Sequence, residues 1–373
     1  MNRRGLWHGG TTEEGPVSEE GAACERMASS YRRYVARKLV FIALCIAGAI
    51  AVTGYAATYG SSGITPGEVY RDIWYHIVDP SRCDETVDWA VFTVRLPRIM
   101  TGLATGMSLG VAGAAMQSMM KNPLADPYTT GISSGASFGA TLALGLGFTV
   151  TGAGGTPGLV STAFVFSLIP AAVIILVSSL KNASAATMIL AGIAVMYLFN
   201  ACTTLIKLTL SEQSLSAVYQ WTVGDLSGST WESFYVILGF TIAGTALLMA
   251  MSKKLNILIT GDRNAKALGL DAHRLRVALL LLISLMAASV VCFTGIIGFV
   301  GLVAPHIVRV FLGADNRYLI PASAAFGAVL LMSADLVSRV VIAPTFLPVG
   351  VITSFIGCPL FLYLLIRQRS SAW

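Results

Sequence analysis

Apolar runs of about twenty residues recur along nearly the whole chain, and they constrain the fold more than any other feature. A bilayer core about 30 Å thick needs about 20 apolar residues in each spanning helix. Backbone groups inside lipid must be hydrogen-bonded within their own segment, so such runs predict helices. The chain is 55% hydrophobic and 12% charged, whereas soluble domains are about 25% charged. We therefore predict an all-α, polytopic membrane protein.

The runs predict ten spans, with both termini on the same side of the membrane. Residues 1–38 are polar and predict a flexible cytoplasmic tail before a ten-span membrane domain at 39–369. A cleaved signal peptide is the alternative, but the first apolar run is too long for a signal core. The predicted spans are Leu39–Tyr59, Pro97–Met120, Tyr128–Phe148, Leu159–Leu180, Thr187–Leu208, Ser233–Met251, Leu275–Thr294, Ile296–Leu312, Leu319–Val340 and Val349–Ile366.

The distribution of basic residues gives this arrangement its direction. From Arg32 onward, sixteen Lys and Arg residues fall at the predicted inner side and six at the outer side. Basic residues accumulate on the cytoplasmic side of membrane proteins. We therefore predict a multi-pass protein of the cytoplasmic (inner) membrane with both termini in the cytoplasm. The loop between the first two spans carries six acidic residues between Gly60 and Asp88 and lies on the outer side.

A polar loop at Ser252–Arg276 separates two predicted spans and carries six basic residues against two acidic ones. Its centre, Asp262–Leu270, predicts a short helix, with Asp262 as the N-cap and Gly269 at the C-terminal end. A tether between two spans needs only a few polar residues, and this loop has many more. The loop therefore predicts a docking element for a soluble partner on the cytoplasmic side, or else a solvated connector.

Few polar side chains lie inside the predicted spans, and such groups are candidates for function. Asp335 and Arg339 stand four residues apart on one helix and can pair, as a structural or a functional ion pair. No series of buried acidic and histidine residues crosses the membrane, which argues against an ion-coupled secondary transporter. His306 alone does not predict an intramembrane enzyme, and a packing role is favoured. Glycines 102, 106, 110 and 113 predict close helix packing.

Chemical motifs are absent from the sequence. It contains no phosphate-binding loop and no zinc-protease motif, and its six cysteines are scattered singly, which favours packing roles. We predict no catalytic residue, no cofactor, no resident metal and no nucleic-acid partner. The +6 net charge follows from the membrane topology.

A set of motifs, in order along the chain, resembles the permeases of bacterial binding-protein-dependent ABC importers for iron–siderophores, haem and vitamin B12 (the FecCD type). The resemblance extends from about Leu39 to Arg369. It implies ten spans in the type II importer permease fold and no ATPase activity of the chain's own. The matching segments are Arg95–Arg98, Gln117, Asn122–Pro127, Gly131, Gly135–Ala136, Trp221, Gly224, Ala267–Gly269, Gly298–His306, Arg309, Asp335, Arg339, Leu347–Gly350 and Gly357–Phe361.

The resemblance also implies sites and partners. The partners are a pair of ABC ATPase subunits, an extracytoplasmic substrate-binding protein, a second permease copy or paralogue, and membrane lipid. The cargo implied is an iron complex, with ferric siderophore preferred to haem or cobalamin. The residues implied for coupling to the ATPase are Asp262, Arg263, Lys266, Ala267, Leu268, Gly269 and Leu270. Those implied for docking the binding protein are the outward-facing Arg95, Arg98 and Arg339. Those implied for the translocation pathway are Met196, Asn200, Thr203 and Thr204.

Overall fold

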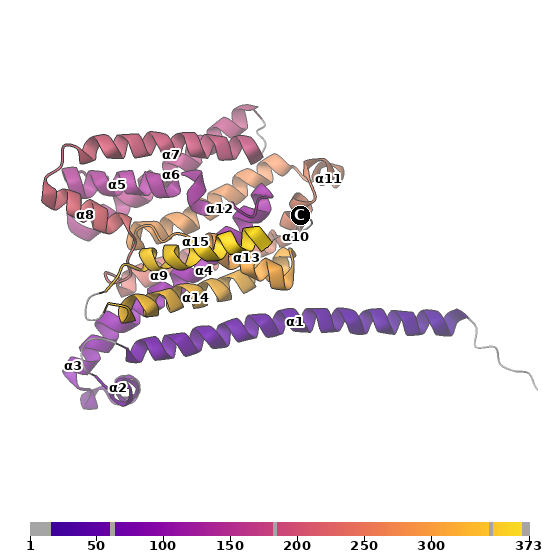
Figure 1. The fold of residues 1–373 in the computed structure, drawn as a ribbon, viewed down its shortest axis with the longest axis horizontal. Coiled ribbons are helices and arrows are strands. Elements are labelled where there is room, and N and C mark those ends of the chain that lie inside the picture. The colour runs from indigo at the N-terminus through magenta and orange to yellow at the C-terminus, as the bar shows by residue number, and fades with distance from the viewer. Residues whose placement is uncertain (1–15, 60–63, 182–184, 343–345, 368–373) are drawn as a thin grey trace, which may run out of the picture.

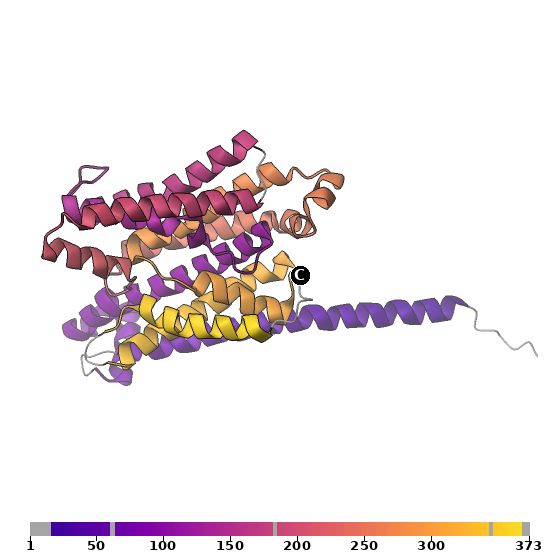
Figure 2. The ribbon, with the colours of Figure 1, turned by 45° about the horizontal axis from the view of Figure 1, so that its top comes forward.

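The computed structural model describes residues 16–59, 64–181, 185–342 and 346–367, and within them every regular element is helical. In this described part of the chain, seven helices are long and apolar enough to cross a membrane. The helices bundle with their axes roughly aligned (Figures 1 and 2). These seven segments are Ser29–Thr58 of α1 (Pro16–Thr58), Glu85–Met120 ending in α4 (Leu96–Met120), Gly155–Leu180 of α6 (Gly155–Lys181), α7 (Ala185–Lys207), α9 (Trp231–Ala250), α12 (Ala272–Thr294) and α14 (Asn316–Val340).

Three other predicted spans are shorter helices. They are α5 (Ile132–Leu146), α13 (Val300–Leu312) and α15 (Val349–Arg367), whose apolar parts are 10–17 residues long. At 1.5 Å per residue, a 15-residue helix is about 22 Å long, less than the bilayer core. The prediction of an all-α membrane bundle is confirmed. Among the described residues, seven of the ten predicted spans are helices long and apolar enough to cross a membrane, and the count of ten stays a prediction.

Helix α4 lies at the centre of the bundle, and nearly all of its residues are buried. Its glycines let α14 and α13 approach to backbone contact. A Cβ on Gly110 would lie 2.1 Å from the carbonyl oxygen of Ser323, and one on Gly113 would lie 1.7 Å from that of Gly301. Both distances are below any tolerable contact, so only glycine fits there. The packing role predicted for this stripe is confirmed.

Helix α1 differs from the expected first segment. It begins at Pro16, so the described residues 16–38 of the predicted tail are helical; residues 1–15 lie outside the described part. Once the apolar span has formed a helix, the helix can extend toward the N-terminus without a second nucleation step. Ala22, Ala23 and Met27 are residue types that favour helix. Figure 2 shows the N-terminal half projecting beyond the bundle. Only 6% of its spanning part is fully buried, and the rest is half-buried or exposed within this chain.

The bundle has two distinct ends (Figure 1). The short helices α10 (Ser252–Ile259) and α11 (Asp262–Ala267) lie at the end where α15 finishes and from which α1 projects. Helices α2 (Pro66–Val78), α3 (Glu85–Asp88) and α8 (Glu212–Thr222) lie toward the other end. The polar stretch after the fifth predicted span contains α8.

Candidate functional site

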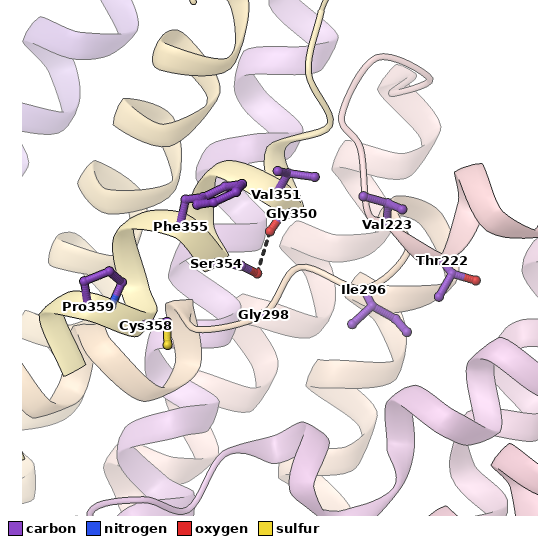
Figure 3. Close-up of a pocket in the computed structure, with 10 residues that line it drawn as sticks. All are labelled: Thr222, Val223, Ile296, Gly298, Gly350, Val351, Ser354, Phe355, Cys358 and Pro359. Atoms are coloured by element: carbon purple, nitrogen blue, oxygen red, sulfur yellow. Dashed lines mark hydrogen bonds between the residues drawn. The ribbon is translucent and has the colours of Figure 1, made fainter. Parts of the chain in front are cut away.

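A surface cavity of about 660 Å³ opens between the end of α8, the loop that precedes α13, and the first half of α15 (Figure 3). Its walls are mainly apolar. The hydroxyl of Ser354 donates to the carbonyl oxygen of Gly350 (2.8 Å). The lining residues are Thr222, Val223, Ile296, Gly298, Gly350, Val351, Ser354, Phe355, Cys358 and Pro359.

Glycines hold three backbone segments together beside this cavity. A Cβ on Gly350 would lie 2.0 Å from the carbonyl oxygen of Val223, and one on Gly224 would lie 2.3 Å from that of Ile296. The Gly350 N–H donates to the Gly224 carbonyl (3.1 Å). Gly295 adopts φ +68°, which ends α12. The eighth predicted span therefore starts at Val300 instead of Ile296, because residues 295–299 cross the bundle as a loop.

The four residues predicted for the pathway lie on α7 and do not line this cavity. Asn200 and Thr204 are exposed on one face, whereas Thr203 is buried and donates to the carbonyl oxygen of Phe199 (2.7 Å). Met196 is half-buried, near Gly131. The prediction could not say which face of this helix points inward, and only Asn200 and Thr204 are open to a partner here.

The loop Ser252–Arg276 forms two short helices, α10 and α11. Gly269 terminates the second as predicted: it has φ +73°, its N–H donates to the Lys266 carbonyl (3.0 Å), and the Leu270 N–H donates to the Ala265 carbonyl (2.9 Å). This pair of bonds is the Schellman arrangement. The helix ends at Ala267, before the predicted Leu270. Leu268 beside it is 67% exposed, an apolar side chain at a basic surface.

Asp262 is not the N-cap that the sequence predicts; Gly261 precedes the helix in that position. The Asp262 carboxylate instead accepts from Arg276 (2.6 and 2.9 Å) and from Lys121 (2.8 Å). Hydrogen bonds from Arg276, and then those from Lys121, hold the pKa of Asp262 well below its ordinary value. Charge-assisted bonds to two cations outcompete a bond to the backbone. The carboxylate therefore ties α11 to the ends of α4 and α12.

Helix α10 has its own anchor, which the sequence did not suggest. Asn256 donates to the carboxylate of Asp315 (2.7 Å), and its carbonyl oxygen accepts from the backbone and side-chain amides of Asn316 (both 2.9 Å). Ser118 donates to Asn316 (2.8 Å). Helices α10 and α11 are thus attached to α4, α12 and α14, while Arg263, Lys266, Ala267, Leu268 and Gly269 remain exposed.

Arg95, Arg98 and Arg339 were expected as exposed charges on the outer rim, and in this structure all three are buried. Arg98 donates to Asp335 through Nε (3.0 Å) and Nη2 (2.8 Å), and Arg339 pairs with the same carboxylate. Arg339 also donates to the Ala56 carbonyl (3.3 Å) and Arg95 to the Ala57 carbonyl (3.0 Å). The unpaired carbonyls at the end of α1 attract such donors. The Asp335–Arg339 pair is confirmed, with Arg98 as a third member.

Comparison with known proteins identifies the family. Residues 39–367 match the profile of the FecCD transport family. The chain belongs to this family. The resemblance read from the motifs is confirmed.

Relatives in the family include permease proteins from several organisms. One assigned to an ABC transporter of Methanocaldococcus jannaschii is 45% identical over 55% of this chain and 59% of its own length. The hemin transport system permease protein HmuU of Yersinia pestis is 36% identical over 56% of this chain and 62% of its own. The cobalamin import system permease protein BtuC of Halobacterium salinarum is 39% identical over 57% of each chain. The alignments thus span about three fifths of these relatives. The names agree with a permease subunit that is not itself an ATPase.

A solved structure of the same fold supports the architecture. It is an inward-facing conformation of a protein assigned to the metal-chelate type of ABC transporter. It superposes with a TM-score of 0.77 at 27% identity and covers 88% of this chain and 99% of its own. The FecCD chain described here therefore has the type II ABC importer permease fold.

Proposed function

We propose that this chain is the permease subunit of an ATP-driven importer that carries an iron complex, a ferric siderophore, across the cytoplasmic membrane. The family match over residues 39–367 carries the proposal. Haem and cobalamin are the alternative cargoes. The names of relatives include permeases for hemin, cobalamin and Fe(3+)-citrate, so iron chelates and large ring systems recur in this family.

The coupling mechanism rests on helices α10 and α11. A separate pair of ATPase subunits closes on binding ATP and seats on Arg263, Lys266, Ala267, Leu268 and Gly269, which are exposed. The Asp262 and Asn256 anchors pass that movement to α4, α12 and α14. An effector changes a two-state protein only if it binds the two states differently. Because α11 is attached to the spans, its movement also moves the spans. The surface that the ATPase contacts therefore differs between the two states of the permease.

Ten spans and cytoplasmic termini complete the topology that we propose. The three shorter helices lie where the third, eighth and tenth spans were predicted, and short helices can cross where protein surrounds their ends. The end that holds α10 and α11 is assigned to the cytoplasm from the excess of basic residues on that side.

The pathway is proposed to pass between two copies of the chain, or between this chain and a paralogue. The cavity beside α15 is open on the surface of a single chain and has an apolar wall (Figure 3). We keep Met196, Asn200, Thr203 and Thr204 as proposed pathway residues, of which Asn200 and Thr204 are exposed on α7. Docking of the binding protein through Arg95, Arg98 and Arg339 stays a prediction, and it requires these buried side chains to be uncovered.

The test is uptake by cells that lack the chain and are complemented with wild type or with Leu268→Glu. Labelled ferric siderophores, haem and cobalamin form the panel. We expect wild type to restore uptake of one class and Leu268→Glu to restore none while reaching the membrane at equal level. The purified chain alone should hydrolyse no ATP. Uptake that follows a proton gradient and continues without ATP would overturn the proposal in favour of a secondary transporter.

A further inference from the structure

The outer loop between the first two spans gathers three different metal-binding side chains. One ligand atom from each of His76, Cys83 and Asp88 lies within 4.8 Å of the other two. Within the described part of the chain, these residues are the one group of three or more His, Cys, Asp or Glu that meets this spacing. The combination of imidazole, thiol and carboxylate is the donor set that Zn²⁺ prefers. The acidic character of the loop is evident from sequence, but this mixed cluster is not.

A fourth side chain in this loop, that of Asp72, has a buried oxygen that lacks a hydrogen-bond partner among the described residues. Asp72 is only 4% exposed, and its Oδ1 accepts from the backbone N–H of Asp84 (3.2 Å). Its Oδ2 is buried and has no hydrogen-bond partner among the described residues. A buried, unpaired carboxylate oxygen is costly unless a cation or donor satisfies it. Asp72 and His76 stand one turn apart on the same face of α2, and Cys83 Sγ donates to the Asp72 carbonyl oxygen (3.9 Å).

The cluster is held in place by its surroundings. The His76 ring stacks on Phe92 with 3.7 Å between ring centroids. Its Nδ1 lies 2.5 Å from Oδ1 of Asp88. The ligand atoms of one tetrahedral zinc ion lie about 3.3 Å from one another. Zinc binding therefore requires Nδ1 of His76 and Oδ1 of Asp88 to move about 1 Å farther apart. Asp84 caps α3 by accepting from the N–H groups of Thr86 and Val87, which fixes the start of the short helix that ends at Asp88.

We propose that His76, Cys83 and Asp88 form a Zn²⁺ site on the outer side of this protein. A water molecule takes the fourth position and donates to Oδ2 of Asp72. The ion joins α2 to the helical turns that lead into Arg95 and α4, and so fixes the outer loop over the end of α1. This inference is independent of the proposed transport function, because it rests on the loop alone.

The experiment uses the full chain in nanodiscs, purified with a non-histidine tag and stripped with a chelator. Zn²⁺ is titrated in and the bound metal is measured by elemental analysis. We expect about one zinc per chain for wild type and an affinity at least about tenfold weaker for His76→Gln and for Cys83→Ser. Cys45→Ser, in α1, is the matched control and should bind as wild type does. Equal zinc binding by Cys83→Ser and wild type would overturn the proposal.

A second measurement avoids variants that fail to fold. In the wild-type chain, Zn²⁺ should slow alkylation of Cys83 by a maleimide, because a metal-bound thiolate is blocked. Cys358, which is exposed on α15, should react at the same rate with and without the ion. Mass spectrometry of the labelled peptides reports both rates. If Zn²⁺ leaves the Cys83 rate unchanged, His76 and Asp88 form only the hydrogen bond seen here and the site does not exist.

Discussion

At the scale of single residues, the sequence predicted only one of the two ion pairs that Asp335 makes. Its carboxylate is fully buried and receives two arginines, from α4 and from its own helix. Spacing along α14 predicts the Arg339 contact, but Arg98 is 237 positions away and nothing local links the two. Removing one member of a buried charge cluster leaves the others uncompensated, which costs about 3–5 kcal/mol.

We therefore expect Asp335→Ala to lower the free energy of unfolding by about 3–5 kcal/mol, because two buried arginines would face each other. Thermal unfolding of the purified chain in detergent measures the effect. Arg71→Ala, on the exposed surface of α2, is the control and should stay within about 0.5 kcal/mol of wild type. An Asp335→Ala chain as stable as wild type would show that the cluster does not hold α4 and α14 together.

The same cluster changes how docking should be tested. A glutamate at position 98 would meet the Asp335 carboxylate inside the bundle, so Arg98→Glu reports folding before it reports docking. Arg95 contacts the end of α1 instead, through the carbonyls of Ala57 and Thr58. A binding measurement on Arg95→Gln, with folding checked, is the more direct test of the docking prediction.

Asp262 permits a prediction about pH. Its pKa is depressed in the folded chain, first by the Arg276 hydrogen bonds. Its contribution to stability is complete above the unfolded pKa of about 4 and is lost as the pH falls toward the folded pKa. The wild-type chain should therefore lose this contribution to its free energy of unfolding only in acid. The Asp262→Asn chain should lack it already at neutral pH, so the two chains should differ more at neutral pH than in acid. Unfolding curves of both chains at about pH 7 and about pH 2 measure this; equal differences at the two values would contradict it.

At the scale of elements, α11 combines a rigid base with an exposed tip. Leu268→Glu should uncouple a bound ATPase and lower transport-linked hydrolysis at least about tenfold, because a charge replaces an apolar contact in the partner's groove. Gly269→Ala should lower the hydrolysis less. The added Cβ meets open space, but alanine is strained at the positive φ of this position, at a cost of about 1 kcal/mol. ATPase activity of the reconstituted complex separates the two. Normal coupling by Leu268→Glu would show that the loop is only a connector.

The elements also show where sequence reasoning stops. Apolar length predicted the helices well, because a backbone inside lipid has few other options. It placed the start of the eighth span wrongly, since Gly295 and Phe299 both have positive φ; Gly295 packs against Trp221 and Gly224, and Phe299 packs against Gly357. It also treated Cys83 as a packing residue, because a cluster built from α2, α3 and the turn between them has no fixed spacing.

At the scale of the whole molecule, the motifs were enough to identify the family, whereas the burial of the arginines could not be read from them. A motif gives the residue type at a position but not its exposure. An arginine that caps the end of α1 and an arginine that faces a partner look the same in the sequence. Hydropathy likewise predicted a first span but not that so little of that span is fully buried within the chain. Such a surface is left for lipid or another subunit to cover.

The proposed second copy gives a prediction for the assembled protein. If the pathway lies between two copies, the exposed Cys358 in the cavity wall should face its equivalent across that space. A chain that keeps Cys358 and has its other cysteines replaced by serine is treated in native membranes with a flexible bis-maleimide. We expect a dimer band on a denaturing gel. A chain that keeps only Cys45, on α1, should stay monomeric. No cross-link from Cys358, or equal cross-linking from Cys45, would place the dimer interface on another face of the bundle.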